Sequence, residues 1–326
     1  MRPPKVGVVI PAYNAERYLG ECVASALAQD WPNLRVYVLD DASTDRTGEV
    51  ISSLASKYPE LVAWSCRKQN KGESITRQEV TEMALDDGCQ YVAPLDADDL
   101  RKPNTLSGQI EALEENPEMG VCYGKTDFIN WRGELHVDSL WELFGAVLKG
   151  QPQGEVWDHL IAYGKIGTMD TIVIREEVAR ACRYDPSFRY YADIDYLAQI
   201  ATLPRLSGFV AVNKVVASYR FHAHQADSRI DQKDLGPVLH STMCTVAFRI
   251  FHRLEEQGRG VSAAKRRNLW RILIFRTMLA YLRRKKWRAS ALMAKDFLMP
   301  LTCLESKFRS YRDLDQLRVT LGVWAH

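Results

Sequence analysis

Three aspartates lie within four residues of one another, directly after an apolar segment. They are Asp96, Asp98 and Asp99, and the segment is Tyr91–Leu95. Carboxylates this close repel one another unless they share a positive charge, and a hard divalent cation such as Mg²⁺ or Mn²⁺ binds carboxylate oxygens. A cation held by one or two carboxylates keeps open positions for a diphosphate. Alternatively, the aspartates form a solvated loop that stabilises the N-terminus of the next helix.

Strand and helix patterns alternate through the first 125 residues. Five apolar runs predict strands at Val6–Ile10, Arg35–Leu39, Leu61–Ser65, Tyr91–Leu95 and Met119–Tyr123. Segments with helical spacing lie between them at 15–29, 44–57, 73–87 and 102–116, the last with Pro103 in its first turn. This order predicts a mostly parallel α/β sheet, whose ligands bind at the carboxyl ends of the strands. Asp40, Asp41 and the three aspartates follow such ends.

The later part of the chain is less regular and becomes wholly helical from about Leu235. We expect helices at 139–149, 153–163, 176–182 and 193–202. We expect a strand at 171–174 and strand residues at 206–219 around a turn at Asn213-Lys214. Three further helices are predicted at 237–256, 262–285 and 287–298.

Several common motifs are absent or incomplete. No GxGxxG follows the first strand, so the phosphate loop of a dinucleotide-binding domain is missing. The run 120–126 is one residue too short for a P-loop and lies in a strand pattern. The GxSxG elbow of many serine hydrolases is also absent. The aspartates therefore remain the main candidate for chemistry.

Five segments resemble, in order and spacing, the motifs of family 2 glycosyltransferases, which have the GT-A fold. The segments are Val8–Asn14, Ser25–Gln29, Val38–Asp45, Asn70–Gly72 with Arg77, and Leu95–Asp99. The resemblance covers about residues 6–125. It implies an inverting enzyme that moves a sugar from a nucleotide-diphospho-sugar to an acceptor hydroxyl, in polysaccharide or glycolipid synthesis. UDP-sugars are favoured by family habit, and guanosine and thymidine donors stay open.

The resemblance also implies which residues bind the nucleoside. Pro11 and Tyr13 would lie against the base, with the Tyr13 ring able to stack on it. Asp41 would accept a hydrogen bond from a base N–H, and Arg77 would contact base or phosphate. Asp45 is expected to brace its loop or to cap the following helix.

Further residues are implied around the diphosphate. Asp96 would bind the ribose, and Asp98 would bind the metal ion, Mn²⁺ or Mg²⁺, that bridges the diphosphate. The segment 218–228 resembles the Tyr-Arg-x-His segment of the family, so Arg220 or His222 would touch the diphosphate, and His222 is a further candidate metal ligand. His222 and His224 have no third partner for a zinc site, and both are alternatively ordinary loop residues.

An inverting transfer needs a base on the acceptor side. By resemblance this base is Asp193, and Asp195 is an alternative base or a partner of the helix dipole. The family typically has Glu where this chain has Ala192, and Asn where it has Gln78. These departures keep a non-catalytic protein that binds nucleotide-sugars as an alternative. A nucleotidyltransferase acting on a sugar phosphate is another, although the glycine-rich loop of that class is missing.

The net charge of +2 conceals two oppositely charged parts. Residues 1–225 carry 23 basic and 32 acidic residues, whereas residues 226–326 carry 20 and 9. We therefore expect a catalytic domain at 1–225 and a basic helical region at 226–326. Through residues 235–298 the basic region would bind an anionic membrane surface, form a homodimer or pack on the catalytic domain. No nucleic-acid-binding module is visible, so nucleic acid is not expected as a partner.

The seven cysteines are scattered and contain no CxxC pair, which fits a reducing compartment. No run of eighteen apolar residues predicts a transmembrane helix, and no signal-peptide core follows the N-terminus. We expect a cytoplasmic protein, with peripheral attachment to the cytoplasmic membrane face if the basic region binds lipid. The acceptor, a saccharide or a lipid-linked sugar, is not specified by the sequence.

Overall fold

The computed structural model describes residues 3–135, 151–163, 166–188, 190–223, 225 and 232–283. The chain forms two compact units. The first contains residues 1–155, 167–189 and 205–225, and the second contains 156–166, 190–204 and 226–326. Two segments that we expected in the catalytic domain, 156–166 and 190–204, thus group with the C-terminal helices. A functional boundary after residue 225 stays a prediction.

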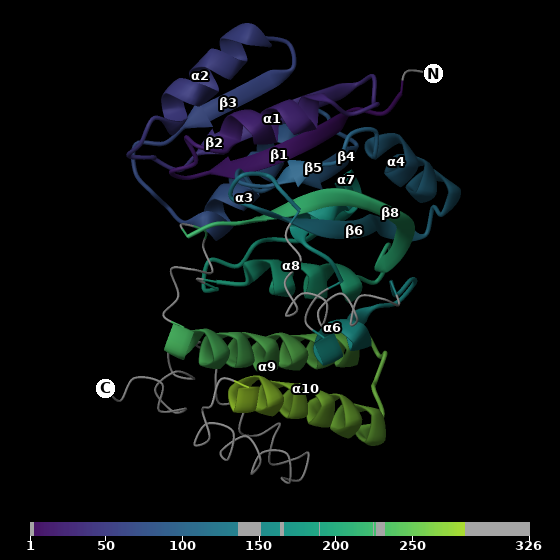
Figure 1. Ribbon diagram of the computed structural model, residues 1–326. Helices are drawn as coiled ribbons and strands as arrows, with labels where there is room; N and C mark the ends of the chain where they lie inside the picture. Colours follow the sequence, from purple (N-terminus) through teal and green to yellow (C-terminus); the bar gives the residue numbers. More distant parts are fainter. Residues whose placement is uncertain are drawn as a thin grey trace. The chain divides into compact units, whose positions relative to one another are not determined.

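An eight-stranded sheet forms the first unit, in the order β3-β2-β1-β4-β7-β6-β8-β5 (Figure 1). The strands are β1 (Val6–Ala12), β2 (Leu34–Asp40), β3 (Val62–Cys66), β4 (Tyr91–Pro94), β5 (Leu100–Arg101), β6 (Met119–Asn130), β7 (Ile172–Arg175) and β8 (Gly208–Phe221). Only β5 and β7 run against the others. The prediction of a mostly parallel sheet is confirmed, and the incomplete P-loop lies inside β6 as expected.

Helices cover both faces of this sheet. They are α1 (Leu19–Leu27), α2 (Thr47–Lys57), α3 (Glu73–Asp86), α4 (Leu106–Glu115) and α7 (Glu176–Ala181). Val8 of β1 belongs to the same buried cluster as Leu19 of α1. The alternate residue Gly7 faces α3, where an added Cβ would lie 2.8 Å from the Cβ of Ala84. Because α1 and α3 pack on opposite faces, β1 is apolar along its whole length.

Two sequence predictions about the first unit are wrong. The helix predicted from residue 102 begins at Leu106, because β5 uses residues 100–101 and Thr105 is the N-cap, so Pro103 lies outside the helix. The predicted turn at Asn213-Lys214 is absent, because β8 is one continuous strand. Its register against β6 jumps from Tyr123↔Ala211 to Lys125↔Val215, so a bulge accommodates the turn-forming residues.

The second unit is helical in its described part. It contains α6 (Trp157–Tyr163), α8 (Ala192–Ala201), α9 (Gln232–Glu256) and α10 (Ala263–Arg283), and α9 packs against the other three. Phe251 and Trp270 join α9 to α10, with ring centroids 6.2 Å apart. The predicted helices at 237–256 and 262–285 are confirmed in α9 and α10, whereas those at 139–149 and 287–298 lie outside the described residues. No helix among the described residues is long and apolar enough to cross a membrane.

Candidate active site

Asp98 and His222 meet at the carboxyl edge of the sheet. Asp98 lies in the bend that follows β4, and His222 follows β8 directly. The imidazole Nε2 of His222 lies 2.8 Å from Oδ2 of Asp98. Two cis ligands of an octahedral cation, with bonds of about 2.1 Å, stand roughly 3 Å apart. The two side chains are hydrogen-bonded in this structure, and their separation would also suit neighbouring ligands of one divalent cation.

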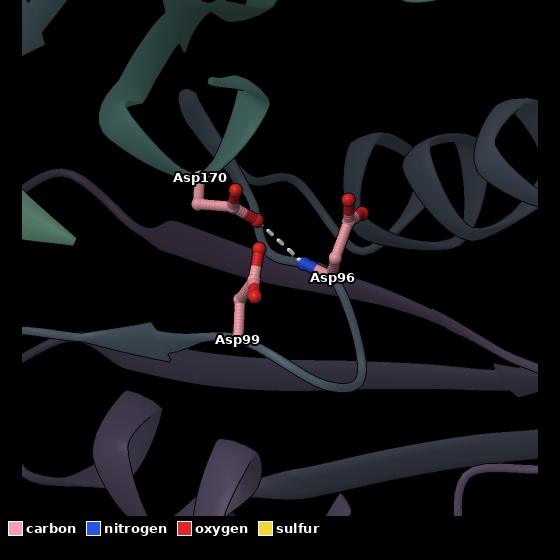
Figure 2. A group of neighbouring side chains, drawn as sticks. All are labelled: Asp96, Asp99 and Asp170. Carbon is pink, nitrogen blue, oxygen red and sulfur yellow. Dashed lines mark hydrogen bonds between the residues drawn. The ribbon is translucent and has the colours of Figure 1, made fainter. Parts of the chain in front are cut away.

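A third element adds a buried carboxylate that the sequence analysis missed. Asp170, from the short 3₁₀ helix η1 (Met169–Thr171), has a carboxylate oxygen within 4.8 Å of oxygens of Asp96 and Asp99. Figure 2 shows the carboxylates of Asp99 and Asp170 facing each other. Asp170 Oδ1 also accepts a hydrogen bond of 2.7 Å from the backbone N–H of Asp96. The only sequence signal was a single acidic residue directly before an apolar strand.

The described residues compensate the negative charge of this cluster only in part, through the ion pair of Arg77 with Asp96 at 2.6 Å. Asp99 and Asp170 are each 1% exposed, and one oxygen of each, Oδ2, has no hydrogen-bond partner among the described residues. Burial raises the pKa of Asp99 well above its usual range, and the charge of Asp170 raises it further. Orphaned buried oxygens of this kind are satisfied by a hard cation. The donor set of carboxylates with one imidazole thus fits Mn²⁺ or Mg²⁺.

Arg220, on β8, holds in place the segment 96–99 between β4 and β5, which we call the aspartate bend. Its guanidinium is 1% exposed, donates from Nε to the carbonyl oxygen of Asp98 at 2.8 Å, and pairs with Glu21 at 2.8 Å. Its backbone N–H donates to Oδ1 of Asp99 at 2.7 Å. In this structure Arg220 therefore acts on the bend between β4 and β5, and its expected contact with a diphosphate stays a prediction.

Helix α1 supports the segment on the other side of the bend. The hydroxyl oxygen of Ser25 accepts a hydrogen bond of 3.0 Å from the backbone N–H of Arg101. The side-chain amide of Gln29 donates to the carbonyl oxygen of Lys102 at 2.9 Å and accepts from the N–H of Thr105 at 3.2 Å. The Ser25–Gln29 segment thus contributes through hydrogen bonds that fix the backbone beyond the aspartates.

Arg77 and Asp96, both expected at the donor, are in direct contact. Arg77 on α3 is buried, and its guanidinium lies 2.6 Å from Asp96 Oδ1 and 2.8 Å from Glu73. Gln78, the next residue, accepts from the N–H of Tyr184 at 3.1 Å and donates to Glu82 at 2.9 Å. The departure from asparagine at this position therefore has a structural role.

Asp41 is buried and already binds the loop that precedes α3. Its carboxylate accepts hydrogen bonds from Arg67 at 2.6 Å and from the N–H groups of Lys71 and Gly72, both at 2.9 Å. A carboxylate has about four acceptor positions, so one position remains for another donor. A ligand that donates a hydrogen bond to Asp41 would therefore contact the same carboxylate that holds this loop.

The remaining predicted residues lie at the ends of β1 and β2. Pro11 is half-buried in β1, and the side chain of Tyr13 after it is 37% exposed. Asp45 accepts from the N–H of Thr47 at 2.9 Å and from the N–H of Glu16 at 3.1 Å. These bonds confirm the prediction that Asp45 braces its loop and the start of α2.

Comparisons with known proteins agree with this geometry. Residues 7–165 match the family model described as "Glycosyl transferase family 2". The segment that carries the aspartates thus belongs to the family 2 glycosyltransferases. The sheet and its helices have the GT-A architecture of the solved glycosyltransferases that this chain resembles.

The chain is similar to proteins of several bacteria. The chain is 25% identical over 239 residues to an uncharacterized glycosyltransferase of Haemophilus influenzae, covering 69% of this chain and 68% of the relative. It is 34% identical over 112 residues to TuaG of Bacillus subtilis, described as a teichuronic acid biosynthesis glycosyltransferase, covering 34% of this chain. The chain spans 43% of the length of TuaG and 40% of EpsE, another relative from Bacillus subtilis.

Two solved structures share the fold of this chain over most of its length. TarS of S. aureus, residues 1–349 in complex with UDP-GlcNAc, has a TM-score of 0.53 at 17% identity, with 90% of this chain and 92% of that chain covered. The mannosyltransferase PcManGT of Pyrobaculum calidifontis, in complex with GDP-Man and Mn²⁺, has a TM-score of 0.55 at 16% identity, with 99% and 87% covered.

Asp193 and Asp195 lie in the second unit, at the start of α8, and have different surroundings. Asp195 is fully buried and accepts hydrogen bonds from Gln199 at 2.9 Å and from Arg249 of α9 at 3.1 Å. Asp193 is half-buried and has no hydrogen-bond or ion-pair partner in the described part of the chain. The residue before the helix, Tyr191, has the left-handed backbone angle φ 62°. Asp195 therefore anchors α8 to α9, and Asp193 is the carboxylate left available.

Proposed function

We propose that this protein is a metal-dependent, inverting glycosyltransferase that moves a sugar from a nucleotide-diphospho-sugar to an acceptor hydroxyl. The observation that carries the proposal is the pairing of Asp98 with His222 beside the buried Asp99 and Asp170. The family 2 match over residues 7–165 supports sugar transfer. The neighbours solved with UDP-GlcNAc and with GDP-Man and Mn²⁺ support a nucleotide-sugar donor.

The donor would extend from the ends of β1 and β2 to the aspartate bend. In this proposal Tyr13 stacks on the base beside Pro11, Asp41 accepts a base N–H, and Asp96 with Arg77 binds ribose and phosphate. UDP-sugars remain the favoured donors, and GDP-sugars are the main alternative because one neighbour binds GDP-Man.

A divalent cation would be held by Asp98 and His222, with Asp99 and Asp170 behind them. When bound, it neutralises the negative charge that develops on the departing diphosphate. The imidazole of His222 favours Mn²⁺ modestly over Mg²⁺, because nitrogen ligands suit Mn²⁺ better. Arg220 would keep the bend rigid, so the ligands need little rearrangement on binding.

Asp193 would accept the proton of the acceptor hydroxyl during its attack on the anomeric carbon. The support is its unpaired carboxylate in the described part of the chain, on a helix that Asp195 and Arg249 fix to α9. The acceptor would be a saccharide or a lipid-linked sugar in polysaccharide or glycolipid synthesis, and the similarity to TuaG supports such a role. The enzyme would act in the cytoplasm. Residues 235–298 would bind an anionic membrane surface or a second copy of the chain, and nucleic acid would not be a partner.

The test is a donor screen with the full chain. UDP-glucose, UDP-GlcNAc, UDP-galactose, dTDP-glucose and GDP-mannose are each incubated with Mn²⁺, Mg²⁺ or EDTA. A donor that binds the native state raises the melting temperature in the presence of metal, and slow transfer to water releases the nucleoside diphosphate. Absence of both signals for every donor would refute the proposal. Release of pyrophosphate from a nucleoside triphosphate and a sugar phosphate would instead identify a nucleotidyltransferase.

A further inference from the structure

A small hollow lies beside the Asp98–His222 pair. It has a volume of about 240 Å³ and is lined by Arg17, Tyr18, Trp131, His222 and Ala223, and we call it the Trp131 hollow. His222, the proposed metal ligand, is one of these lining residues, and its ring centroid lies 4.7 Å from that of Tyr18. The hollow therefore adjoins the proposed metal site. A hollow of this size is too small for a whole nucleotide-sugar and matches one phosphate or one sugar unit.

Two arginines converge on the exposed tryptophan of this hollow. The guanidinium carbon of Arg17 lies 4.8 Å from the ring centroid of Trp131, and that of Arg132 lies 4.4 Å from it. Trp131 is 45% exposed. Stacking on one indole limits the freedom of both guanidinium groups, and it places them less than about 10 Å apart. The two guanidinium groups therefore form one positively charged patch around the ring, and Arg17 is the one that lines the hollow.

These two arginines differ from the paired arginines around them. Arg46 pairs with Glu16, and Arg220 pairs with Glu21. Among the described residues, neither Arg17 nor Arg132 has a carboxylate partner. Two uncompensated guanidinium groups, held by a ring at the rim of a hollow, form a receptor for an anion, because charge-assisted hydrogen bonds to phosphate or carboxylate are among the strongest in proteins.

The hollow is lined from two parts of the sheet. Arg17 and Tyr18 belong to the segment after β1, as Tyr13 does, whereas Trp131 and His222 follow β6 and β8, which lie beyond β4 and β7 in the strand order. The hollow thus extends the site from the proposed nucleoside-binding segment toward β6 and β8. An acceptor must approach the donor sugar from outside the nucleotide.

We propose that the acceptor of this enzyme is anionic and that its phosphate or carboxylate group binds Arg17 in the Trp131 hollow, with Arg132 on the same indole adding positive charge. The inference rests on the proposed function and deepens it, since it names the chemical class of the acceptor. Both sources of negative charge, a sugar acid and a phosphate ester, suit this positively charged patch.

The experiment measures binding of matched charged and neutral probes to the full chain by titration calorimetry. Tetragalacturonate is compared with its methyl ester, and glycerol 3-phosphate with glycerol, so that carboxylate and phosphate are tested separately. Arg17→Gln and Arg132→Gln remove one charge each, and Trp131→Ala removes the ring that holds them. The control is Arg205→Gln, because Arg205 is exposed and lies at the amino end of β8, opposite His222.

We expect at least one charged probe to bind more tightly than its neutral partner and more weakly at higher salt. Each arginine variant and Trp131→Ala should weaken this binding by roughly tenfold, while Arg205→Gln does not. Donor binding, measured in parallel by thermal shift with Mn²⁺, should be unchanged in all four variants. Equal binding of charged and neutral probes, or no binding of either charged probe, would overturn the inference.

Two further outcomes separate the inference from the proposed function. If Arg17→Gln and Arg132→Gln weaken donor binding as much as probe binding, the hollow binds the donor diphosphate and the inference is wrong. If the unmodified protein binds the charged probe in the hollow but binds no donor, the anion site stands and the proposed function fails.

Discussion

Nε2 of His222 lies 2.8 Å from Oδ2 of Asp98, although 124 residues separate the two in the sequence. Asp98 follows β4, the fourth strand along the chain, and His222 follows β8, the last strand in the described part of the chain. Neither residue alone specifies a metal site, because a solvated carboxylate and a loop histidine are both common. Their contact, with an orphaned buried carboxylate oxygen on each of Asp99 and Asp170 nearby, gives the site its chemical character.

Removing either member of this pair should weaken Mn²⁺ binding. We expect Asp98→Asn and His222→Gln each to raise the Kd for Mn²⁺ by about tenfold or more, because each removes one ligand. The free Mn²⁺ signal in electron paramagnetic resonance measures the Kd directly, without any donor. Asp86→Asn is the matched control, since the Asp86 side chain is 79% exposed at the end of α3. An unchanged Kd in both variants would exclude this pair as the metal site.

Asp193→Asn should separate catalysis from donor binding. The amide cannot accept the acceptor proton, so kcat should fall by about 10²- to 10⁴-fold. The thermal shift given by the donor and Mn²⁺ should stay as in the unmodified protein. Asp158→Asn serves as the control, because Asp158 is a surface carboxylate of the same unit that pairs with Lys265 at 3.0 Å. Full activity of Asp193→Asn would mean that another group is the base.

The buried guanidinium of Arg220 should contribute strongly to stability. Arg220→Met removes the donors to Asp98 and Glu21, and the backbone carbonyl of Asp98 loses its partner. We expect the free energy of unfolding to fall by about 3 kcal/mol, measured by urea denaturation. Glu21→Gln should cost less than about 1 kcal/mol, because the Glu21 side chain is 64% exposed. Equal effects of the two substitutions would show that the ion pair, rather than the bond to the bend, matters.

Asp87 should give a measurable pH dependence of stability. Hydrogen bonds from Lys5 and Tyr37, together with Arg35, lower the pKa of Asp87 to about 2. Because the folded-state pKa lies below the unfolded value of about 3.9, this contribution is present above pH 4 and is lost as the pH falls through about 2. With allowance for partial exposure, Asp87→Asn should cost about 1 kcal/mol at pH 7 and little near pH 2. Urea denaturation at both pH values measures the difference, and an equal cost at both would contradict this account.

The sequence was most informative where the pattern is local and repeated. Alternation of apolar strands and amphipathic helices along the chain predicted a mostly parallel sheet, and the position of the aspartates after Tyr91–Leu95 predicted the edge where they lie. The bulge in β8 was missed because Asn213-Lys214 has the composition of a turn, while ten or more residues of pairing with β6 keep the strand continuous.

Residues that act through distant partners could not be assigned from their own neighbours in the chain. Asp170 gave no signal, because its meaning depends on the backbone of Asp96 and the carboxylate of Asp99. Arg220 was expected at a diphosphate, yet its burial against the aspartate bend follows from the curl of β8 toward β5 and α1. Such contacts form only when the sheet is folded, so the residues next to Asp170 and Arg220 in the sequence do not reveal them.

The carboxylate of Asp170 and the backbone N–H of Arg220 both lie beyond residue 165, where the match to the family ends. A truncated chain that stops there would keep the donor motifs up to Asp99 but would lack strands β7 and β8 and the segment that carries Arg220 and His222. For protein engineering, this means that a chimera joined at the end of the matched region would exchange the recognition motifs without the parts that shape them. A workable junction has to lie after His222, so the exchangeable module is longer than the region by which the family is recognised.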